Sequence, residues 1–431
     1  MAGPFHRVSI AKGVSFSAVQ DTKFKHNRLS ISMLMPLEEG KLSERAIVPY
    51  ILRQGTRKYP DFTKLNERLS DLYGASLEAN VDKFGAYQLM NLGMVGIDSR
   101  FAFDGEDMVK ELADLLGDIL LDPFVEQGAF SAKETELEKE YLKDSIEAEI
   151  NDKRSYALMR CRSIMCQGEA LALRKLGTVE EVEAITPKSA YKAYLELLDK
   201  AQIEIMMSGC GDPEAACEAF RQRFAAMERH PIAVDVNTCR KQPVKEQKDI
   251  SEEMDVKQGK LVLALHTDMN CSLEERTASR VAVALLGGTA TSLLHTNVRE
   301  KLSLCYYCAA RLDTATGILL VDSGVEAENC DKTRDACMEQ ITAMQKGDFE
   351  ESLLHETQLF FKTAYRATGD SLGAMENWYL TNILLGNEES LEEGLLACQK
   401  VTKEQIVAAA NKLKLDTVYR LIPTAEVKEG E

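Results

Sequence analysis

Apolar and polar residues alternate at the start of the chain. The alternation runs through residues 8–10, 14–16 and 29–34, and a period of two predicts β-strands within residues 7–36. Further strands are expected at 76–81, 87–95 and 201–208. Apolar residues three and four positions apart predict helices at 43–53, between Asp61 and Gly74, at 104–121, at 126–166, from Pro187, and at 213–227. Ser43, Asp61 and Thr186 are the expected N-caps.

The second half repeats this order of elements. Strands are expected at 261–266, 304–312, 317–325 and 418–422, and helices at 273–286, 292–302, 329–344, 349–367, 369–385 and after Thr402. One-sided alternation in the strands favours a single layer of helices on each sheet. We therefore expect an α+β fold of two similar domains, each an antiparallel sheet with helices packed on one face. The alternative is that two unrelated α+β domains look alike by chance.

The composition changes at residues 229–259. This stretch holds Pro231, Pro243, many charges and few large apolar residues, which is typical of a connection between domains. The predicted division is an N-terminal domain at 1–228, a linker at 229–245 and a C-terminal domain at 246–431.

Composition narrows the class of protein. The 431 residues are 45% hydrophobic and 28% charged, which are ordinary globular values. The net charge of −17 argues against nonspecific nucleic-acid binding, which needs a positive surface. Eleven cysteines without paired spacing suit a reducing compartment better than a disulfide framework. With no signal-peptide pattern and no apolar run of about 18 residues, the expectation is a cytoplasmic chain without a membrane span.

A glycine-rich turn precedes the most informative motif. Gly287-Gly288-Thr289-Ala290-Thr291-Ser292 leads into a predicted short helix and then a strand. The motif residues are Arg299, Glu300, Lys301, Leu304 and Tyr306. This pattern resembles a signature of the M16 peptidases, the insulinase and mitochondrial-processing-peptidase superfamily. Gly55-Thr56 followed by Pro60, and residues 121–124 leading to Phe130, are similar to two further segments of that family.

The resemblance implies both a fold and a site. The fold would be two tandem M16-type (LuxS/MPP-like) domains. In the family the arginine and tyrosine of the second half reach the substrate near the zinc site, which implies substrate binding by Arg299 and Tyr306. Guanidinium and phenol donors can bind the carbonyl oxygens of an extended backbone. Residues 23–25 and 300–307 look closest to a bacterial subgroup, the YmfF-like proteins, which are associated with the 5-aminopentanol modification of elongation factor P and thought to lack activity.

The family's zinc motif is missing from the chain. M16 peptidases bind zinc through His-x-x-Glu-His on a helix, because residues four apart project from one helix face, and through a distant glutamate. Counted from the Gly55-Thr56 turn, the motif falls on residues 46–50. The resemblance places Ala46 and Tyr50 at the two histidine positions and Pro49 at the position of the base, and the distant ligand falls near Ser145. No two of the six histidines are four apart, so the motif exists nowhere in the sequence. We expect no metal and no cofactor in this chain, with zinc only in a partner.

Other chemistry-bearing residues have simpler interpretations. Cys305 and Cys308 form a lone Cys-x-x-Cys, and residues i and i+3 of a strand point to opposite faces, so this pair is weak evidence for a metal. His355 and Glu356 read as a surface pair. We expect Trp378, Tyr379 and Phe360-Phe361 to belong to the hydrophobic core and not to a binding site.

Three functional hypotheses remain open from the sequence. The first is a catalytically inactive M16-like subunit that pairs with a zinc-bearing sister chain and lends Arg299 and Tyr306 to a peptide-processing chamber. The second is a module, alone or as a homodimer, that holds a peptide or unfolded polypeptide without hydrolysis. The third is a structural partner that stabilises another enzyme. A peptidase acting alone is the least supported.

Overall fold

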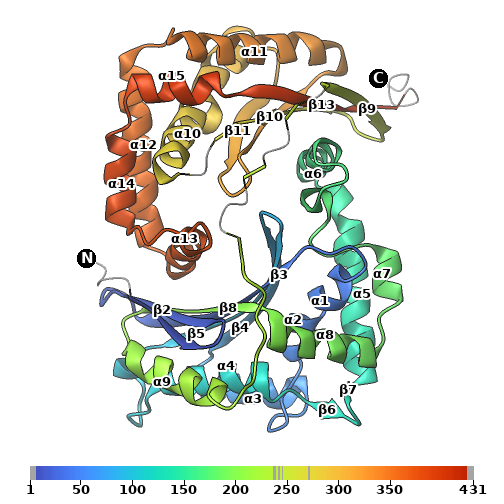
Figure 1. The fold of residues 1–431 in the computed structure, drawn as a ribbon, viewed down its shortest axis with the longest axis vertical. Coiled ribbons are helices and arrows are strands. Elements are labelled where there is room, and N and C mark those ends of the chain that lie inside the picture. The colour runs from blue at the N-terminus through green and yellow to red at the C-terminus, as the bar shows by residue number, and fades with distance from the viewer. Residues whose placement is uncertain (1–5, 236–238, 241–242, 245, 270–271, 425–431) are drawn as a thin grey trace. The chain divides into compact units, whose positions relative to one another are not determined.

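The computed structural model describes residues 6–235, 239–240, 243–244, 246–269 and 272–424. The chain forms two compact units, and each combines segments from both halves of the sequence (Figure 1). Unit 1 holds Met1–Glu147, Leu173–Val236 and Thr368–Glu388. Unit 2 holds Ala148–Ala172, Asn237–Ala367 and Glu389–Glu431.

Unit 1 contains a six-stranded sheet. Its strands are β1 (His6–Ala11), β2 (Val14–Gln20), β3 (His26–Pro36), β4 (Ser76–Phe84), β5 (Tyr87–Ile97) and β8 (Gln202–Gly209), in the order β1-β2-β8-β3-β5-β4. All neighbours are antiparallel except β2 and β8. The predicted strands are thus confirmed, each within a few residues of its expected bounds.

Helices cover one face of this sheet. The helices that contact its strands on this face are α1 (Leu42–Ala46), α2 (Val48–Leu52), α4 (Met108–Leu121), α8 (Pro187–Lys200) and α9 (Pro213–Phe224). The unit also holds α3 (Phe62–Asp71), α5 (Ala132–Ala148), α7 (Val179–Glu183) and the short strands β6 (Val125–Glu126) and β7 (Ala129–Phe130). Asp61 and Thr186 accept backbone N–H groups as predicted N-caps. Ser43 does not cap a helix; it lies inside α1, where its hydroxyl donates to the Leu176 carbonyl. The helix predicted to start at 104 starts instead after Asp107.

The other face of the same sheet is covered by a helix from the second half of the sequence. Helix α13 (Leu372–Leu384) packs on β8 and β3 (Figure 1). Arg28 on β3 donates from Nε to Glu376 on α13, at 2.6 Å, and from Nη1 to Glu78 on β4, at 2.8 Å. The guanidinium crosses Gly93 on β5, where an added Cβ would lie 2.9 Å from Nη2. Only glycine leaves room for this crossing.

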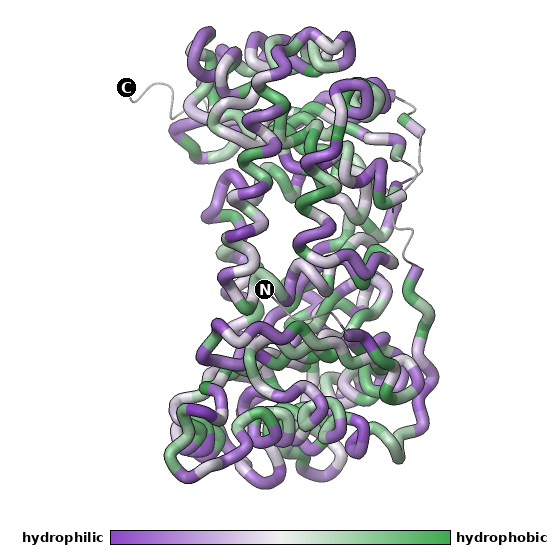
Figure 2. The backbone as a smooth tube through the Cα atoms, turned by 90° about the vertical axis from the view of Figure 1, so that its left-hand side faces the viewer, coloured by the Kyte–Doolittle hydropathy of each residue, from purple (hydrophilic) through white to green (hydrophobic). Residues whose placement is uncertain are grey.

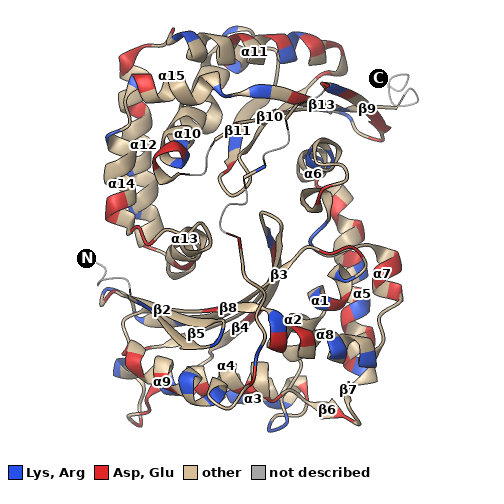
Figure 3. Ribbon diagram, viewed as in Figure 1, with Lys and Arg blue, Asp and Glu red and all other residues tan. Residues whose placement is uncertain are grey.

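Unit 2 contains a five-stranded sheet. Its strands are β9 (Lys248–Met254), β10 (Gly259–His266), β11 (Tyr307–Asp313), β12 (Ile318–Val325) and β13 (Lys414–Pro423), in the order β11-β12-β10-β13-β9. The neighbours are antiparallel except β13 and β9. Strand β9 was not predicted, because Asp249, Glu252 and Glu253 made its sequence look like a charged connection (Figure 3). It survives as an edge strand, where charged side chains reach water.

The helix layer of unit 2 largely follows the predicted order. It holds α10 (Leu273–Val283), the π-helical segments η4 (Ala284–Gly288) and η5 (Leu294–Lys301), α11 (Cys330–Lys346), α12 (Glu351–Gly369), α14 (Leu391–Gln399) and α15 (Lys403–Asn411); α14 was not predicted. Thr402 caps α15 as expected. Short hydrophobic and hydrophilic stretches alternate along most helices, as expected for elements with one buried face (Figure 2). Short 3-10 turns complete the two units at η1 (Ser99–Phe101), η2 (Glu149–Asn151), η3 (Ala170–Ala172) and η6 (Ala327–Asn329).

The second face of the unit 2 sheet is covered by a helix from the first half of the sequence. Helix α6 (Lys153–Met165) packs on β10 and β13. Three of its arginines pair with carboxylates of the sheet: Arg154 with Asp322, Arg160 with Glu252, and Arg162 with Asp313. The two halves of the chain therefore exchange one helix each, and the predicted helix 126–166 is divided between the units.

The predicted α+β fold, with largely antiparallel sheets and a helix layer on one face, is confirmed. The exchanged helices α6 and α13 add cover to the second face of each sheet. The domain bounds 1–228 and 246–431 remain a prediction. Residues 236–238, 241–242 and 245 of the predicted linker lie outside the described residues. Of the cysteines in the described part, Cys239 is disulfide-bonded, which the expectation of free thiols did not include. No helix in the described ranges has both the length and the apolar composition to cross a lipid bilayer.

Candidate functional site

Two π-helical segments position the Arg299 motif. Segment η4 ends at Gly287-Gly288, and η5 begins after Leu293. A Cβ on Gly287 would lie 2.7 Å from the backbone nitrogen of Ala310, so this glycine lets η4 approach β11 closely. Buried Ser292 donates to the Thr289 carbonyl at 2.6 Å and closes the turn between the segments. π-Helical turns are rare and occur frequently at functional sites.

Arg299 and Tyr306 lie close together. Arg299 Nε donates to the backbone carbonyl of Tyr306 at 2.9 Å, and Nη1 donates to His295 Nε2 at 2.6 Å. Nη1 also lies 3.0 Å from Glu300 Oε1. The Tyr306 hydroxyl donates to Glu326 at 2.7 Å. The Arg299 side chain is 41% exposed and Tyr306 is 60% exposed, so both side chains reach the surface of unit 2.

The structure corrects the predicted local geometry. Strand β11 begins at Tyr307, so Tyr306 precedes it instead of lying inside a strand from 304. Ser303 adopts a φ of 51°, a left-handed conformation that turns the chain from η5 into β11. His295 and Glu326 were not foreseen as partners. Of these two contacts, only that of His295 could have been predicted, because it stands four residues before Arg299 and that spacing brings helical side chains together.

The positions aligned with the lost zinc motif lie in unit 1. Ala46 ends α1 and is fully buried; Pro49 and Tyr50 lie in α2, which begins after Ile47. Proline cannot donate a backbone hydrogen bond, which is consistent with the break of the predicted helix 43–53 at Ile47. Burial raises the pKa of the Tyr50 hydroxyl to about 12, with smaller contributions from Tyr141 and Asp82.

Helix α5 supplies the other side of this region. Tyr141 places its ring 5.4 Å from that of Tyr50, and the Ser145 hydroxyl donates to the Tyr141 carbonyl at 2.8 Å. Glu138 is 2% exposed, and burial raises its pKa, while Gln54, which donates to it, and Arg53 act in the opposite direction. The buried Glu138 was missed in the sequence. The sequence feature that could have pointed to Glu138 is its spacing of seven residues, two helical turns, from Ser145.

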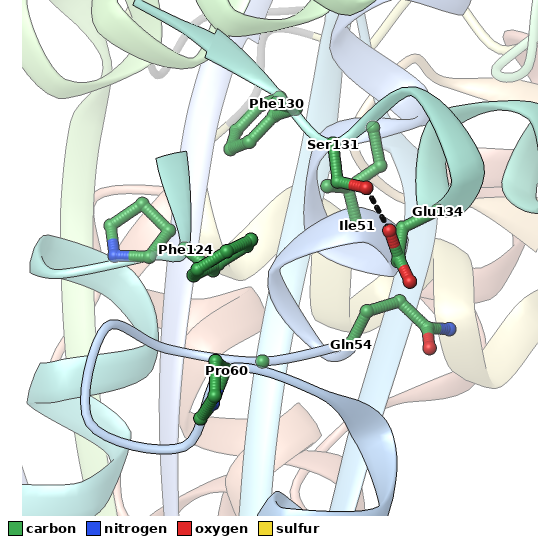
Figure 4. A pocket seen from close by; sticks show the side chains of 9 residues that line it. Ile51, Gln54, Pro60, Phe124, Phe130, Ser131 and Glu134 are labelled. Atoms are coloured by element: carbon green, nitrogen blue, oxygen red, sulfur yellow. Dashed lines mark hydrogen bonds between the residues drawn. The ribbon is translucent and has the colours of Figure 1, made fainter. Parts of the chain in front are cut away.

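The two other family-like segments meet beside this region. Thr56 and Pro123 form an isolated β-bridge, and Arg57 donates its backbone N–H to the Asp122 carbonyl at 2.9 Å. A small pocket opens between them (Figure 4), lined by Ile51, Gln54, Gly55, Pro60, Pro123, Phe124, Phe130, Ser131 and Glu134. The structure thus brings together the two segments of the first half that resemble segments of the M16 family. Arg299 and Tyr306 belong to the other unit.

The alternative candidates have structural explanations. Cys305 precedes β11, so the argument that residues i and i+3 of a strand face apart does not apply to it. The Cys308 thiol lies 3.6 Å from that of Cys337. Tyr379 and Phe361 are buried as expected, whereas Phe360 is 41% exposed. His355 and Glu356 are exposed. Within the described residues, no group of three or more His, Cys, Asp or Glu side chains could hold a metal ion.

Comparison with known proteins decides the family. Residues 184–359 match the Peptidase M16 inactive domain. Over 411 residues the chain is 30% identical to the probable inactive metalloprotease YmfF of Bacillus subtilis (strain 168), covering 95% of this chain and 96% of that protein. The chain belongs to the M16 peptidase family. The predicted resemblance to M16 and to its YmfF-like members is confirmed, and the match to an inactive domain agrees with the prediction that this M16 chain is no peptidase on its own.

Solved structures agree with this M16 assignment. A conserved protein from Enterococcus faecalis V583 is 26% identical with a TM-score of 0.87, covering 98% of this chain and 99% of that one. The peptidase M16 inactive domain from Pseudomonas fluorescens is 17% identical with a TM-score of 0.77, covering 98% of each chain. At that lower identity the second likeness concerns the fold alone.

We expect the purified protein to bind no stoichiometric zinc and to cleave no peptide. The reason is the sequence: none of its six histidines is four residues from another, so no helix offers two imidazoles to one ion. Elemental analysis after gel filtration measures the zinc content, and a fluorogenic peptide mixture measures cleavage. One tightly bound zinc per chain, or cleavage that a chelator abolishes, would contradict this expectation.

Proposed function

We propose that this chain is the non-catalytic subunit of an M16-type peptidase. It would pair with a zinc-bearing sister chain and contribute Arg299 and Tyr306 to the binding of a polypeptide substrate. The sister would supply the metal, the zinc-bound water and the base. The observation that carries the proposal is the contrast between the two motifs: the metal-ligand positions are occupied by Ala46, Tyr50 and Ser145, whereas the arginine–tyrosine segment is complete.

The geometry of Arg299 supports a role in binding. His295, Glu300 and the Tyr306 carbonyl occupy Nε and Nη1, and within the described residues Nη2 makes no hydrogen bond. These contacts fix the plane of the guanidinium and leave one edge for a ligand. A pre-oriented guanidinium can donate to peptide carbonyl oxygens and stabilise negative charge as it develops on one of them. The phenol of Tyr306 can do the same when its hydroxyl turns from Glu326 to the ligand.

We expect Arg299→Ala to leave the fold nearly unchanged, because a half-exposed side chain usually contributes about 0.5 kcal/mol or less. In the complex with the zinc-bearing sister, it is expected to reduce turnover by about two orders of magnitude, as for the loss of an oxyanion donor. Tyr306→Phe should act in the same direction and less than additively with it. The measurement is kcat/KM of the purified complex with a fluorogenic peptide.

A matched control is Lys301→Ala, an exposed cation on the same segment, which should leave turnover unchanged. The first step is to test whether an M16 chain carrying His-x-x-Glu-His co-purifies with this one. If the complex forms and Arg299→Ala turns over substrate at the wild-type rate, a shared site is wrong. If no such partner is found but the isolated chain binds unfolded polypeptide in an Arg299-dependent manner, the chain is instead a non-hydrolytic peptide-binding module, alone or as a homodimer.

A further inference from the structure

A cluster of cations lies on the face of the unit 2 sheet that α6 covers. Its cations are Arg154 on α6, Lys260 on β10 and Arg311 on β11, and they surround the ring of Tyr307 on β11. Asp322 on β12 lies beneath them and is 1% exposed. We call Arg154, Lys260, Tyr307 and Arg311 the cationic cluster. It is built from two strands and one helix, with Asp322 on a third strand beneath it, so its side chains are held by elements that the core fixes.

An aromatic ring forms the floor of the cluster. Tyr307 lies over Gly324, where an added Cβ would be 2.4 Å from Cε1 of the ring, so only glycine allows this position. The Arg154 guanidinium carbon lies 4.2 Å from the ring centroid, and Lys260 Nζ lies 5.8 Å from it. Cation–π contacts of this kind hold two positive charges over one ring. Like charges held near one another favour an anion between them.

The carboxylates of the sheet do not neutralise the cluster. Asp322 receives Arg154 Nε at 2.5 Å, and Arg311 Nε lies 3.5 Å from its other oxygen. Asp152 also acts on Lys260 and Tyr307, and its carboxylate is engaged as the N-cap of α6. Among the described residues, Asp152 and Asp322 are the acidic groups that act on Lys260 and Tyr307, against the three cations Arg154, Lys260 and Arg311.

Lys260 carries the unmatched charge. Its Nζ donates to Gln258 Oε1 at 2.5 Å, and within the described residues it has no carboxylate partner. Burial and the charge of Arg154 lower the pKa of Lys260, against the opposing effects of Asp152 and Asp322. Both nitrogens Nη1 and Nη2 of Arg154 also make no hydrogen bond to the described residues. An anion that bound here would find several free N–H donors and would offset the repulsion between the cations.

We propose that the cationic cluster binds a carboxylate of a polypeptide, supplied by an Asp or Glu side chain or by a free C-terminus. This inference rests on the proposed function, since it names the class of polypeptide that the site would take. The chain as a whole has a net charge of −17, so its surface as a whole repels acidic peptides. A preference for an acidic peptide must then arise from a local site of opposite charge.

The test uses the full chain and short unstructured peptides labelled at the N-terminus. One peptide contains a single Glu, its partner has Gln at that place, and each is made with a free and with an amidated C-terminus. Fluorescence polarisation gives the Kd of each. The wild type is expected to bind the preferred carboxylate about tenfold more tightly than its neutral counterpart, the value of one charge-assisted hydrogen bond. The Glu–Gln pair and the acid–amide pair distinguish the two sources of the carboxylate.

Lys260→Met is expected to abolish this preference and to leave the Kd of the neutral peptide unchanged. Lys257→Met is the matched control, because Lys257 is an exposed lysine three residues away, and it should keep the preference. If peptides bind in an Arg299-dependent manner but Lys260→Met retains the preference, or the wild type shows none, the carboxylate site is wrong and the proposed function stands. If no peptide binds the chain alone in any arm, the carboxylate site is wrong, whereas the proposed function is decided separately by the turnover of the complex with Arg299→Ala.

Discussion

Arg229→Met is expected to reduce the free energy of unfolding by about 3 kcal/mol or more. The arginine is 1% exposed and donates to three backbone carbonyls, those of Leu198, Ala201 and Lys12. Methionine fills most of the volume but donates nothing. Each buried carbonyl left without a donor costs about 1–3 kcal/mol. The loss concerns unit 1, because the three carbonyls come from the end of α8, its C-cap residue just before β8, and the β1–β2 turn.

The single tryptophan makes this measurement direct. Trp378 lies on α13 in unit 1, so its fluorescence during urea titration follows the unit that Arg229 stabilises. Arg221→Met is the control, since this arginine is exposed on α9 and its partners among the described residues, Glu218 and the Cys217 thiol, belong to its own helix. It should cost about 0.5 kcal/mol or less. An Arg229→Met variant with the urea midpoint of the wild type would show that water replaces the guanidinium at all three carbonyls.

Local patterns were sufficient to predict most elements. Strands β3 and β10 and helices α8 and α15 follow from period-two alternation, helical spacing and the caps Thr186 and Thr402. These signals are local, because a cap or an apolar stripe acts within one element. Strand β9 escaped prediction for the same reason: its charged sequence becomes a strand only by pairing with β13, which lies far along the chain.

The exchange of α6 and α13 could not be predicted from the sequence. An amphipathic helix shows that it buries one face, but not which sheet covers it. The deciding contacts join residues far apart in sequence, such as Arg28 with Glu376 and Arg154 with Asp322. The glycines that permit them, Gly93 and Gly324, look like ordinary strand residues until the side chains that cross them are known.

The sequence predicted which residues form the candidate site, but not which residues surround and contact them. The identity of Arg299 and Tyr306 came from a linear motif, whereas His295, Glu326 and the π-helical shape of η5 depend on how that segment packs on β11 and α11. The loss of the zinc ligands required only a count of histidines. The cationic cluster required three strands and α6 to be in register, which no linear pattern contains.

Arg28→Met is expected to cost about 3–5 kcal/mol near neutral pH, and less in acid. The substitution leaves Glu376 without its cation, and the side chain of Glu376 is only 7% exposed. Breaking a buried pair by removing one partner leaves a buried charge that nothing compensates. Glu78, the second partner of Arg28, is 44% exposed and regains water, so it contributes little to the loss.

The pH dependence follows from the pKa of Glu376. Burial raises this pKa above its ordinary value of 4.5, and Arg28 opposes the rise. Without Arg28 the folded-state pKa rises further, so between the unfolded and folded pKa values the folded variant binds more protons than the unfolded chain. Its stability is therefore fully retained below the unfolded pKa and is lost as the pH increases through the folded pKa. The difference in the free energy of unfolding between wild type and variant, measured by urea titration with Trp378 fluorescence, should be larger at about pH 8 than at about pH 5.

Adding Glu376→Gln to Arg28→Met should remove this pH dependence and recover part of the stability, because a neutral amide loses less on burial than a carboxylate. A difference that stays constant with pH would mean that Glu376 is solvated in the variant and that Arg28 does not hold α13 to the sheet through it.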